Sequence, residues 1–421
     1  MNTSRRVATF IITMLILAFS LLTILVDSRL CFSSTTYVVN TDDSIQTAIN
    51  NANNGDTILI SSGEHIEKSY PIIVNKSLTI VGENTLTTII NGNGTDKGIF
   101  LVNANDVKIG KLTILNTTQY LWVSGIHLKN AQRVIIFDCI IRECGSGVQL
   151  TNASKCNILR NNITFSYSAG IYLHGGSTYN IIRGNTIFNN PTGLFITDIE
   201  SSYNKIFHNS FIDNVQQQSS VGISNQWDDG YPSGGNFWSD HQGADYYHGV
   251  EQNIDGGDGI VDVTYKDLDR YPLLAPPTFF KVYSVDQEEY YIVAISNASI
   301  SNVCFNPEGR LFNFTVHGFN VSTSFLRISI PKTLLWTNNM NEWLITINGT
   351  LLNNPFIFED DNSTYFYIKF IGNLAHIEIK GTFAIPEFLT MYIWTLFSIQ
   401  FYLIILRLKI LSRRLSRQVK S

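Results

Sequence analysis

Short apolar runs, separated by glycine, asparagine and serine, fill the chain between about residues 35 and 225. Within this stretch one phrase occurs four times, a glycine followed by an apolar residue, a polar or aromatic residue and a second apolar residue. Its copies begin at Gly125, Gly147, Gly170 and Gly193, which are 22, 23 and 23 residues apart. The runs are too short for helices, and a nearly constant period of this length predicts stacked coils of strands.

A second phrase keeps step with the first at residues 157–162, 180–185 and 204–209, and each copy ends in asparagine. Together the two phrases predict an all-β fold, a right-handed parallel β-helix over residues 35–225. Equivalent corner residues of such coils lie above one another. We therefore predict an amide ladder of Asn162, Asn185 and Asn209, with Cys139 as a small buried residue at its end.

The two ends of the predicted β-helix differ from its repeats. Residues 36–60 have the pattern strand, amphipathic helix, strand, and a helix over 44–52 would cover the apolar core and unpaired strand edges of the first coil. Residues 226–275 form a closing segment rich in tryptophan, glycine and aspartate. From 276 to 384, after Pro276 and Pro277, longer alternating runs predict a β-sandwich.

Several of these motifs resemble a known family. The coils and the covering helix resemble the parallel β-helix repeat family typified by NosD-like proteins and by carbohydrate-binding and sugar-hydrolysis (CASH) domains. The motif at 227–240, Trp-Asp-Asp-Gly-Tyr-Pro-Ser-Gly-Gly-Asn-Phe-Trp-Ser-Asp, and the Asp-Arg-Tyr-Pro-Leu motif at 269–273 resemble the closing segment of archaeal NosD-like repeats. The resemblance covers roughly residues 35 to 273 and implies the pectate-lyase-like superfold.

Hydrophobic segments at both termini point to export and membrane attachment. Residues 1–34 hold a basic start and an apolar run over 7–26, which predicts a signal peptide or signal anchor. Residues 385–421 hold an uncharged stretch over 388–406 and a basic tail, which predicts a transmembrane anchor with a cytoplasmic tail. The Pro-Glu-Phe at 386–388 resembles the PEF-type C-terminal sorting signals of archaeal surface proteins. We expect an extracellular domain held at the cell surface in the plasma membrane, by this helix or, after processing, by a lipid.

Composition limits the classes of binding partner and the modifications that we expect. A net charge of −5, with basic residues concentrated at the termini, gives no nucleic-acid-binding surface. Five cysteines form neither a disulfide framework nor a metal site, although one disulfide among Cys139, Cys144 and Cys156 is an option. A glycoprotein is expected from the Asn-x-Ser/Thr sites that begin at Asn75, Asn93, Asn116, Asn152, Asn162, Asn297, Asn313, Asn320, Asn348 and Asn362.

A candidate ligand-binding surface follows from strand alternation. If the apolar residues of the glycine phrase point inward, then His127, Gln149, Tyr172 and Phe195 point outward in one column. Polar and aromatic groups about one strand spacing apart, roughly 4.8 Å, are suited to stack on sugar rings. The alternative is that these side chains pack against a loop or a glycan.

A candidate calcium site lies in the closing segment. Asn253, Asp255, Asp258 and Asp262 place oxygen donors among glycines, as calcium loops do. The spacing departs from that of an EF-hand and the closing glutamate is missing, so a plain acidic turn is the alternative. Copper, which the resemblance to NosD-like proteins brings in, needs clustered His, Cys or Met. Because none of the four methionines lies in the predicted β-helix, copper is not supported.

Catalytic groups are harder to find. Sugar hydrolysis needs paired carboxylates, and lyase chemistry needs calcium-bound carboxylates and a base. The candidates are Asp198, Glu200 and His174, which are scattered in register rather than stacked. The sequence therefore favours non-catalytic binding of carbohydrate or cell-envelope components. A polysaccharide lyase or glycoside hydrolase, or a purely structural surface protein, are the alternatives.

Overall fold

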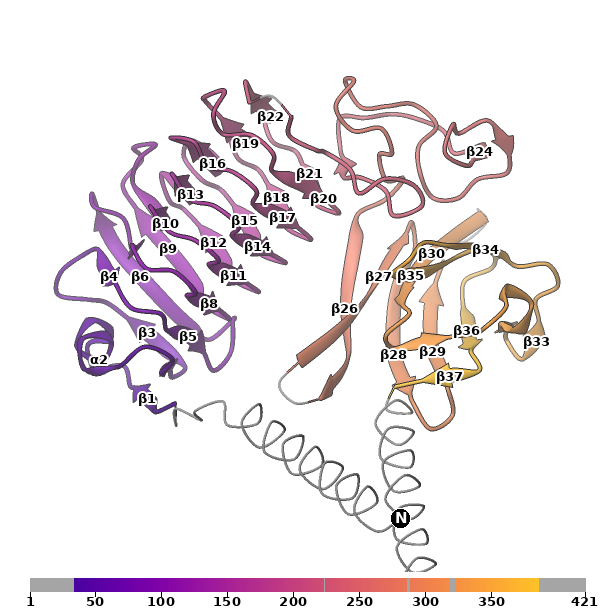
Figure 1. Cartoon of the computed structure of the whole chain (residues 1–421), viewed down its shortest axis with the longest axis horizontal. Helices are drawn as coiled ribbons and strands as arrows, with labels where there is room; N and C mark the ends of the chain where they lie inside the picture. Colours follow the sequence, from indigo (N-terminus) through magenta and orange to yellow (C-terminus); the bar gives the residue numbers. More distant parts are fainter. Residues whose placement is uncertain (1–33, 223, 286–287, 319–322, 386–421) are drawn as a thin grey trace, which may run out of the picture.

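The computed structural model describes residues 34–385, apart from 223, 286–287 and 319–322. The regular secondary structure of this part is almost entirely β-strand, and the chain forms a parallel β-helix, a closing segment and a pair of antiparallel sheets (Figure 1). The predicted parallel β-helix is confirmed, and the terminal hydrophobic runs lie outside the described residues. No helix in the described ranges is both long enough and apolar enough to cross a membrane.

Three parallel sheets form the faces of the β-helix, and each coil contributes one strand to each face. The first sheet consists of β1 (Thr36–Val39), β2 (Thr57–Ile60), β5 (Thr79–Gly82), β8 (Lys108–Gly110), β11 (Ile135–Phe137), β14 (Asn157–Leu159), β17 (Ile181–Arg183) and β20 (Lys205–Phe207). The second consists of β4 (Ile72–Val74), β7 (Phe100–Val102), β10 (Ser124–Lys129), β13 (Ser146–Thr151), β16 (Ala169–His174), β19 (Thr192–Ile196) and β22 (Gln216–Ser220). The third consists of β3 (Gly63–His65), β6 (Thr88–Thr95), β9 (Thr113–Thr117), β12 (Ile140–Arg142), β15 (Asn162–Thr164), β18 (Thr186–Phe188), β21 (Ser210–Ile212) and β23 (Phe237–Trp238).

The core is a stack of mostly branched apolar side chains, to which all three sheets contribute. On the second sheet Ile126, Val148, Ile171 and Leu194 are paired in register, and all four are fully buried. Each buried side chain of this size contributes about 1.5–3 kcal/mol. The repetition of the glycine phrase therefore reflects one inward position of the second sheet repeated in successive coils.

A short helix covers the first coil, as predicted. The helix α2 (Ile45–Asn51) begins after Ser44, whose hydroxyl accepts a hydrogen bond from the backbone N–H of Thr47. Ile45 and Ile49 are fully buried and join the apolar core of the β-helix. The helix thus removes the open end that the first coil would otherwise expose.

The predicted asparagine ladder exists, but its first member is wrong by one residue. Asn161, not Asn162, accepts at Oδ1 the backbone N–H of Cys139 and donates its own N–H to Asn185. Asn185 bonds to Asn209 in the same way, and Asn162 is exposed on β15. Cys139 is buried at the end of the ladder, as predicted. Two parallel ladders run through Asn180, Asn204 and Asn225 and through Asn190 and Asn214.

The ladder residues follow corners with left-handed backbone geometry. Asp138, Arg160 and His208 have φ values of 52°, 53° and 53° and directly precede Cys139, Asn161 and Asn209. Such a conformation costs a non-glycine residue roughly 1–2 kcal/mol. The buried amide hydrogen bonds that follow each corner offset this cost by fixing the backbone.

The closing segment covers the last coil with aromatic rings. Trp238 stacks between Phe211 and Tyr265, with ring centroids 4.4 and 4.0 Å away. Trp227, Trp238 and Tyr265 belong to the apolar core of the β-helix. A small antiparallel pair, β24 (Tyr247–His248) and β25 (Ile254–Asp255), lies farther out in the segment. The tryptophan-rich motif therefore closes the second end of the core.

Two five-stranded antiparallel sheets follow, where the sequence predicts long alternating runs. The fourth sheet consists of β26 (Pro277–Val285), β27 (Glu288–Ser296), β30 (Thr323–Pro331), β35 (Ser363–Ile371) and β34 (Phe356–Glu359). The fifth consists of β28 (Ser299–Asn306), β29 (Leu311–His317), β36 (Ala375–Lys380), β32 (Leu344–Ile347) and β33 (Thr350–Leu351). The remaining elements are β31 (Leu335–Trp336), which pairs with β37 (Phe383–Ala384), and the 3₁₀-helix η1 (Met340–Glu342). Both sheets contribute to one apolar core, which includes Ile328, Phe366, Phe312 and Ile377.

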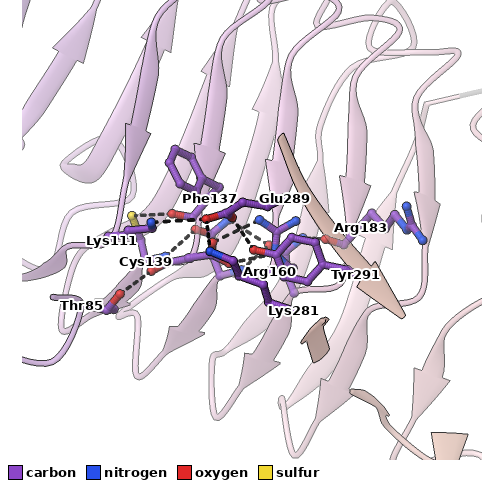
Figure 2. A network of polar contacts seen from close by, with 12 residues as sticks. Thr85, Lys111, Phe137, Cys139, Arg160, Arg183, Lys281, Glu289 and Tyr291 are labelled. Atoms are coloured by element: carbon purple, nitrogen blue, oxygen red, sulfur yellow. Dashed lines mark hydrogen bonds and ion pairs between the residues drawn. The ribbon is translucent and has the colours of Figure 1, made fainter. Parts of the chain in front are cut away.

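The fourth sheet lies against the first sheet of the β-helix through a polar network (Figure 2). The guanidinium of Arg160 lies 4.0 Å from the ring centroid of Tyr291 and makes two hydrogen bonds to Asp138, of 2.8 and 3.1 Å. Glu289 accepts from Lys281 at 2.7 Å and lies 3.6 Å from Lys111. These contacts connect β27 to successive corners of the β-helix.

Candidate functional site

The second sheet brings the four predicted binding residues into one column. His127 pairs in register with Gln149, Gln149 with Tyr172, and Tyr172 with Phe195. The neighbouring residues of the same strands are the buried core residues described above, so the four side chains lie on the outer side of the sheet. We call this set the outer column.

The outer column is not uniformly accessible. His127, Tyr172 and Phe195 are partly exposed, whereas only 3% of Gln149 is exposed. Gln149 Nε2 lies 2.9 Å from His174 Nε2, and Ser124 Oγ lies 3.4 Å from Gln149 Oε1. Gln149 therefore helps to position Ser124 and His174 by hydrogen bonds, and it offers little surface to a ligand.

Thr151 connects two histidines of this face. Its Oγ1 lies 2.8 Å from Nε2 of His127 and 2.8 Å from Nε2 of His174. Burial, with the nearby His174 and Lys129, lowers the pKa of His127 to about 4. Burial also lowers the pKa of His174, although Asp198 opposes this shift. Both imidazoles are therefore neutral at neutral pH, and they offer hydrogen-bonding groups without a charge.

Three rings form a stacked platform beside these polar groups. The ring of Tyr172 lies 4.6 Å from that of His174 and 5.5 Å from that of Phe195, with interplanar angles of 19° and 23°. The Tyr172 hydroxyl accepts a long hydrogen bond of 3.5 Å from Thr197 Oγ1. Rings that stack in this way combine apolar faces with polar edges, the combination that sugar rings require.

The three catalytic candidates do not form one catalytic group. Asp198 accepts backbone N–H groups of Gly175, Gly176 and Ser201 at 2.7, 3.3 and 2.8 Å. Burial acts to raise the pKa of Asp198, but hydrogen bonds from Ser201 and these amides outweigh it, and the pKa lies below its usual value. Glu200 is exposed, and its carboxylate makes no hydrogen bond or ion pair with the residues that the structure describes. Of the three candidates, His174 alone joins the outer column.

The predicted calcium donors face different turns. Asp258 Oδ1 accepts the N–H of Ile260, Asp262 accepts the N–H groups of Tyr246 and Tyr247, and Asn253 and Asp255 are exposed. Another residue pins this segment: Asp245 accepts from Asp258 N, Gly259 N and the Tyr367 hydroxyl at 2.8, 2.9 and 2.8 Å. Within the described residues the predicted donors are not gathered around one point, and binding of Ca²⁺ stays a prediction.

Sequence reasoning missed a second surface, at the corners between the third and second sheets. Exposed aromatic residues gather there: Tyr120 and Trp122 stack with centroids 5.4 Å apart, and Phe165 and Tyr167 are 51% and 42% exposed. A groove of about 740 Å³ includes the second of these two pairs in its wall and is lined by Glu143, Phe165, Ser166, Tyr167, Asn189, Asn190, Pro191, Asp213 and Val215. The sequence does contain a sign of this surface: Tyr120 and Phe165 occupy the same position in their repeats, five residues before the glycine that begins the phrase.

The four cysteines within the described residues are separate thiols. Cys139, Cys144 and Cys156 are buried and free, so the disulfide considered from the sequence is not formed, and Cys304 is exposed. Burial raises the pKa of Cys139 and of Cys144 to about 12. These thiols act as small core residues and not as thiolate ligands.

Solved structures with a similar course of chain include several proteins that act on polysaccharides. The catalytic domain of a GH87 α-1,3-glucanase in complex with nigerose has a TM-score of 0.36 and 18% identity over 49% of this chain and 38% of that one. Pectate lyase Pel9A has a TM-score of 0.32 and 12% identity over 49% and 75%. The Dettilon tailspike protein has a TM-score of 0.31 and 14% identity over 82% and 85%. The chain spans about two fifths of the glucanase domain, and these likenesses concern the fold alone.

No curated protein sequence matches the chain. Among protein families, the one described as periplasmic copper-binding protein (NosD) matches residues 33–243, just over half of the chain. The description implies copper, yet residues 34–385, outside the gaps noted above, hold no group of three or more His, Cys, Asp or Glu side chains that could bind a metal ion. The side chains in these ranges therefore do not fit a copper centre. The match itself, over half of the chain, shows that the chain belongs to the NosD family.

Proposed function

We propose that the protein binds a glycan on the outer column, outside the cell and without catalysis. The observation that carries this proposal is the stack of His174, Tyr172 and Phe195 beside the hydrogen-bonding pair of His127 and Thr151. Successive coils present these groups about 4.8 Å apart. An extended saccharide lying across the coils would stack its ring faces on the aromatic residues and bond its hydroxyls to the neutral imidazoles.

The placement of the acidic residues supports binding rather than turnover. Both retaining and inverting hydrolysis need two carboxylates that flank the same bond. Asp198 holds a turn and Glu200 is exposed away from any partner among the described residues. An enzyme remains the alternative, with the groove beside Phe165 and Tyr167 as its place, because Glu143 and Asp213 both line that groove.

We further propose that the protein is displayed on a cell surface, in an archaeon, and carries N-linked glycans. The apolar runs over 7–26 and 388–406, the basic tail and the Asn-x-Ser/Thr sites support this location. The fourth and fifth sheets, taken together as a β-sandwich, would then separate the β-helix from the membrane anchor. A rigid stack of coils is suited to present one long face to an envelope glycan.

The test is a polysaccharide array probed with the full-length chain in detergent, with and without calcium. Retention of the protein and new reducing or unsaturated ends are both recorded. We expect retention without products. Products from any polysaccharide would overturn the non-catalytic proposal. If the array shows no retention and no products, the result would favour a purely structural surface protein.

Matched variants then assign the binding surface. Tyr172→Ala and Phe195→Ala should weaken binding of the retained glycan by about tenfold or more, because each removes a stacking face. Tyr179→Ala is the control: Tyr179 is exposed and also stacks, on Tyr203 at 5.3 Å, but lies at a corner away from the outer column. An equal loss in all three variants would contradict the assignment.

A further inference from the structure

A cavity of about 680 Å³ lies between the β-helix and the fourth sheet. Corners of the β-helix at Arg160, Arg183 and His208 form one wall, and Tyr291, Tyr365 and the turn at 360–363 form the other. The volume falls within the range of about 300–1,000 Å³ typical of small-molecule sites. The cavity lies on a different face from the outer column, so an inference about it is independent of the proposed function.

Arg183 is the unusual group in this cavity. Its guanidinium carbon lies 5.2 Å from the ring centroid of Phe207 and 5.3 Å from that of Phe279. Its Nε is buried without a hydrogen-bond partner. Across the described ranges, its side chain has no hydrogen bond and no ion pair. A cation held between two rings without an acceptor is costly unless a further group neutralises it.

The other arginine in the wall shows what a satisfied cation looks like here. Arg160 is paired with Asp138 and stacked on Tyr291, whereas Figure 2 shows Arg183 to one side of that network. The contrast between neighbouring coils indicates that stacking on aromatic rings does not by itself account for Arg183. The guanidinium fork of Arg183 is free to bind a planar or tetrahedral anion.

Burial lowers the pKa of Arg183, and the nearby Asp229 opposes this shift. No carboxylate of the cavity, however, forms an ion pair with Arg183 among the residues that the structure describes. Asp229 is paired with Lys205 and accepts a hydrogen bond from Ser233 Oγ at 2.8 Å. Asp360 accepts the hydroxyl of Tyr365 at 2.7 Å and two backbone N–H groups. Glu289 and Lys332 also have partners, Lys281 and Glu359, and Asp361 is exposed.

His208 adds a neutral polar atom next to Arg183. Its Nε2 lies 3.0 Å from the carbonyl oxygen of Ser233, so Nε2 carries the proton and Nδ1 is an acceptor. Nδ1 is buried and has no partner. Burial and the nearby Arg183 hold the pKa of His208 down at about 3, which keeps the ring neutral. The wall therefore offers an anion-binding fork beside an acceptor for a hydroxyl.

We propose that this cavity binds a small oxyanion, a carboxylate or phosphate carried by a molecule of about one or two sugar rings, and that Arg183 binds the anionic group. Phe207 and Phe279 hold the guanidinium in place from the β-helix and the fourth sheet. Because Phe279 belongs to β26, an occupied site also fixes the fourth sheet against the β-helix.

Isothermal titration calorimetry on the full-length chain tests the proposal with four probes: glucuronate, glucose 6-phosphate, inorganic phosphate and glucose. We expect saturable binding of at least one oxyanion and binding of glucose that is weaker by about tenfold or more. Glucuronate against glucose 6-phosphate separates a carboxylate from a phosphate ester, and inorganic phosphate shows whether the sugar ring is needed. Binding of no oxyanion, or equal binding of glucose, would overturn the proposal.

Arg183→Met keeps the apolar stem and removes the charge, and it should weaken oxyanion binding by about tenfold or more. Arg133→Met is the matched control, because Arg133 is an exposed arginine paired with Asp106 at another corner. If Arg183→Met does not fold, the wild-type chain still decides: a bound oxyanion should protect Arg183 from modification by phenylglyoxal, read by peptide mass spectrometry. Unchanged modification of Arg183, or unchanged affinity in Arg183→Met, would refute the assignment.

Discussion

The backbone N–H of Asn236 donates to Asp269 Oδ2 at 2.7 Å. Asn236 Oδ1 itself accepts the N–H of Asn209, so the contact with Asp269 ends the amide ladder that begins at Asn161. Each ladder residue donates forward to the next coil, so the last one needs a group that only accepts. In its ionised form Asp269 is such a group: it also accepts from Trp238 Nε1 at 2.9 Å and from the N–H of Tyr271 at 3.1 Å. A carboxylate therefore terminates the ladder within the closing segment.

We expect Asp269 to make stability depend on pH. Burial raises its pKa to about 7, although the hydrogen bonds from Asn236, Trp238 and Tyr271 oppose the shift. The folded state thus binds this proton more tightly than the unfolded state, in which the pKa is near 3.9. The contribution is fully present below about pH 4 and is lost as pH rises to about 7, with a slope of at most about 1.4 kcal/mol per pH unit. Urea unfolding at several pH values, compared with Asp269→Asn, measures it, and parallel pH profiles would contradict the assignment.

The ladder itself can be tested with two adjacent asparagines. Asn161→Ala leaves the buried N–H of Cys139 and the carbonyl of Ile136 without their partners, and should lower the free energy of unfolding by about 2–4 kcal/mol. Asn162→Ala removes an exposed side chain on the neighbouring position and should change it by less than about 0.5 kcal/mol. Chemical denaturation of both variants decides whether Asn161 or Asn162 belongs to the ladder. A larger loss of unfolding free energy in Asn162→Ala would support the ladder through Asn162 that the sequence predicted.

That error of one residue shows how far the repeat could be predicted. The glycine phrase advances 23 residues from Gly147 to Gly170, whereas the ladder advances 24 from Asn161 to Asn185. Strand pairing fixes the faces of each coil, but the corners gain or lose a residue, as at Gly175 and Gly176. Periodicity therefore predicts the inward and outward faces, and it leaves the residue at a corner undetermined where two asparagines are adjacent.

The outer column could be predicted from the sequence to a similar extent. Alternation gave the register of the outer column because every member lies within a strand. The burial of Gln149 depends on His174, which lies at the end of the next strand, and no pattern within one strand reports it. The cavity beside Arg183 was beyond sequence reasoning, since its second aromatic residue, Phe279, comes from a different part of the fold.

The buried Arg327 of β30 should hold the closing segment against the fourth sheet. It is 1% exposed and donates to the backbone carbonyls of Pro232 and Asp258. Arg327→Met leaves both carbonyls buried without partners, so we expect a loss of about 2–4 kcal/mol and faster proteolysis within residues 226–275. Arg142→Met is the control, because its ion pair with Glu143 is exposed and should contribute less than about 1 kcal/mol. Proteolysis at the wild-type rate would mean that other contacts hold the segment.

His127 should oppose Asp269 over the same range of pH. Its pKa is lowered to about 4 by burial and by the nearby His174 and Lys129, against about 6.5 in the unfolded chain. Its contribution to stability is therefore present above about pH 6.5 and is lost as pH falls toward 4, the reverse of the trend for Asp269. The two effects partly cancel in the wild-type chain, and single variants separate them. Relative to wild type, His127→Gln should become more stable as the solution is acidified and Asp269→Asn less stable. If NMR shows that the imidazole of His127 titrates near 6.5, the outer column is more exposed to solvent than its geometry implies. Its histidines would then be partly charged when they meet a ligand.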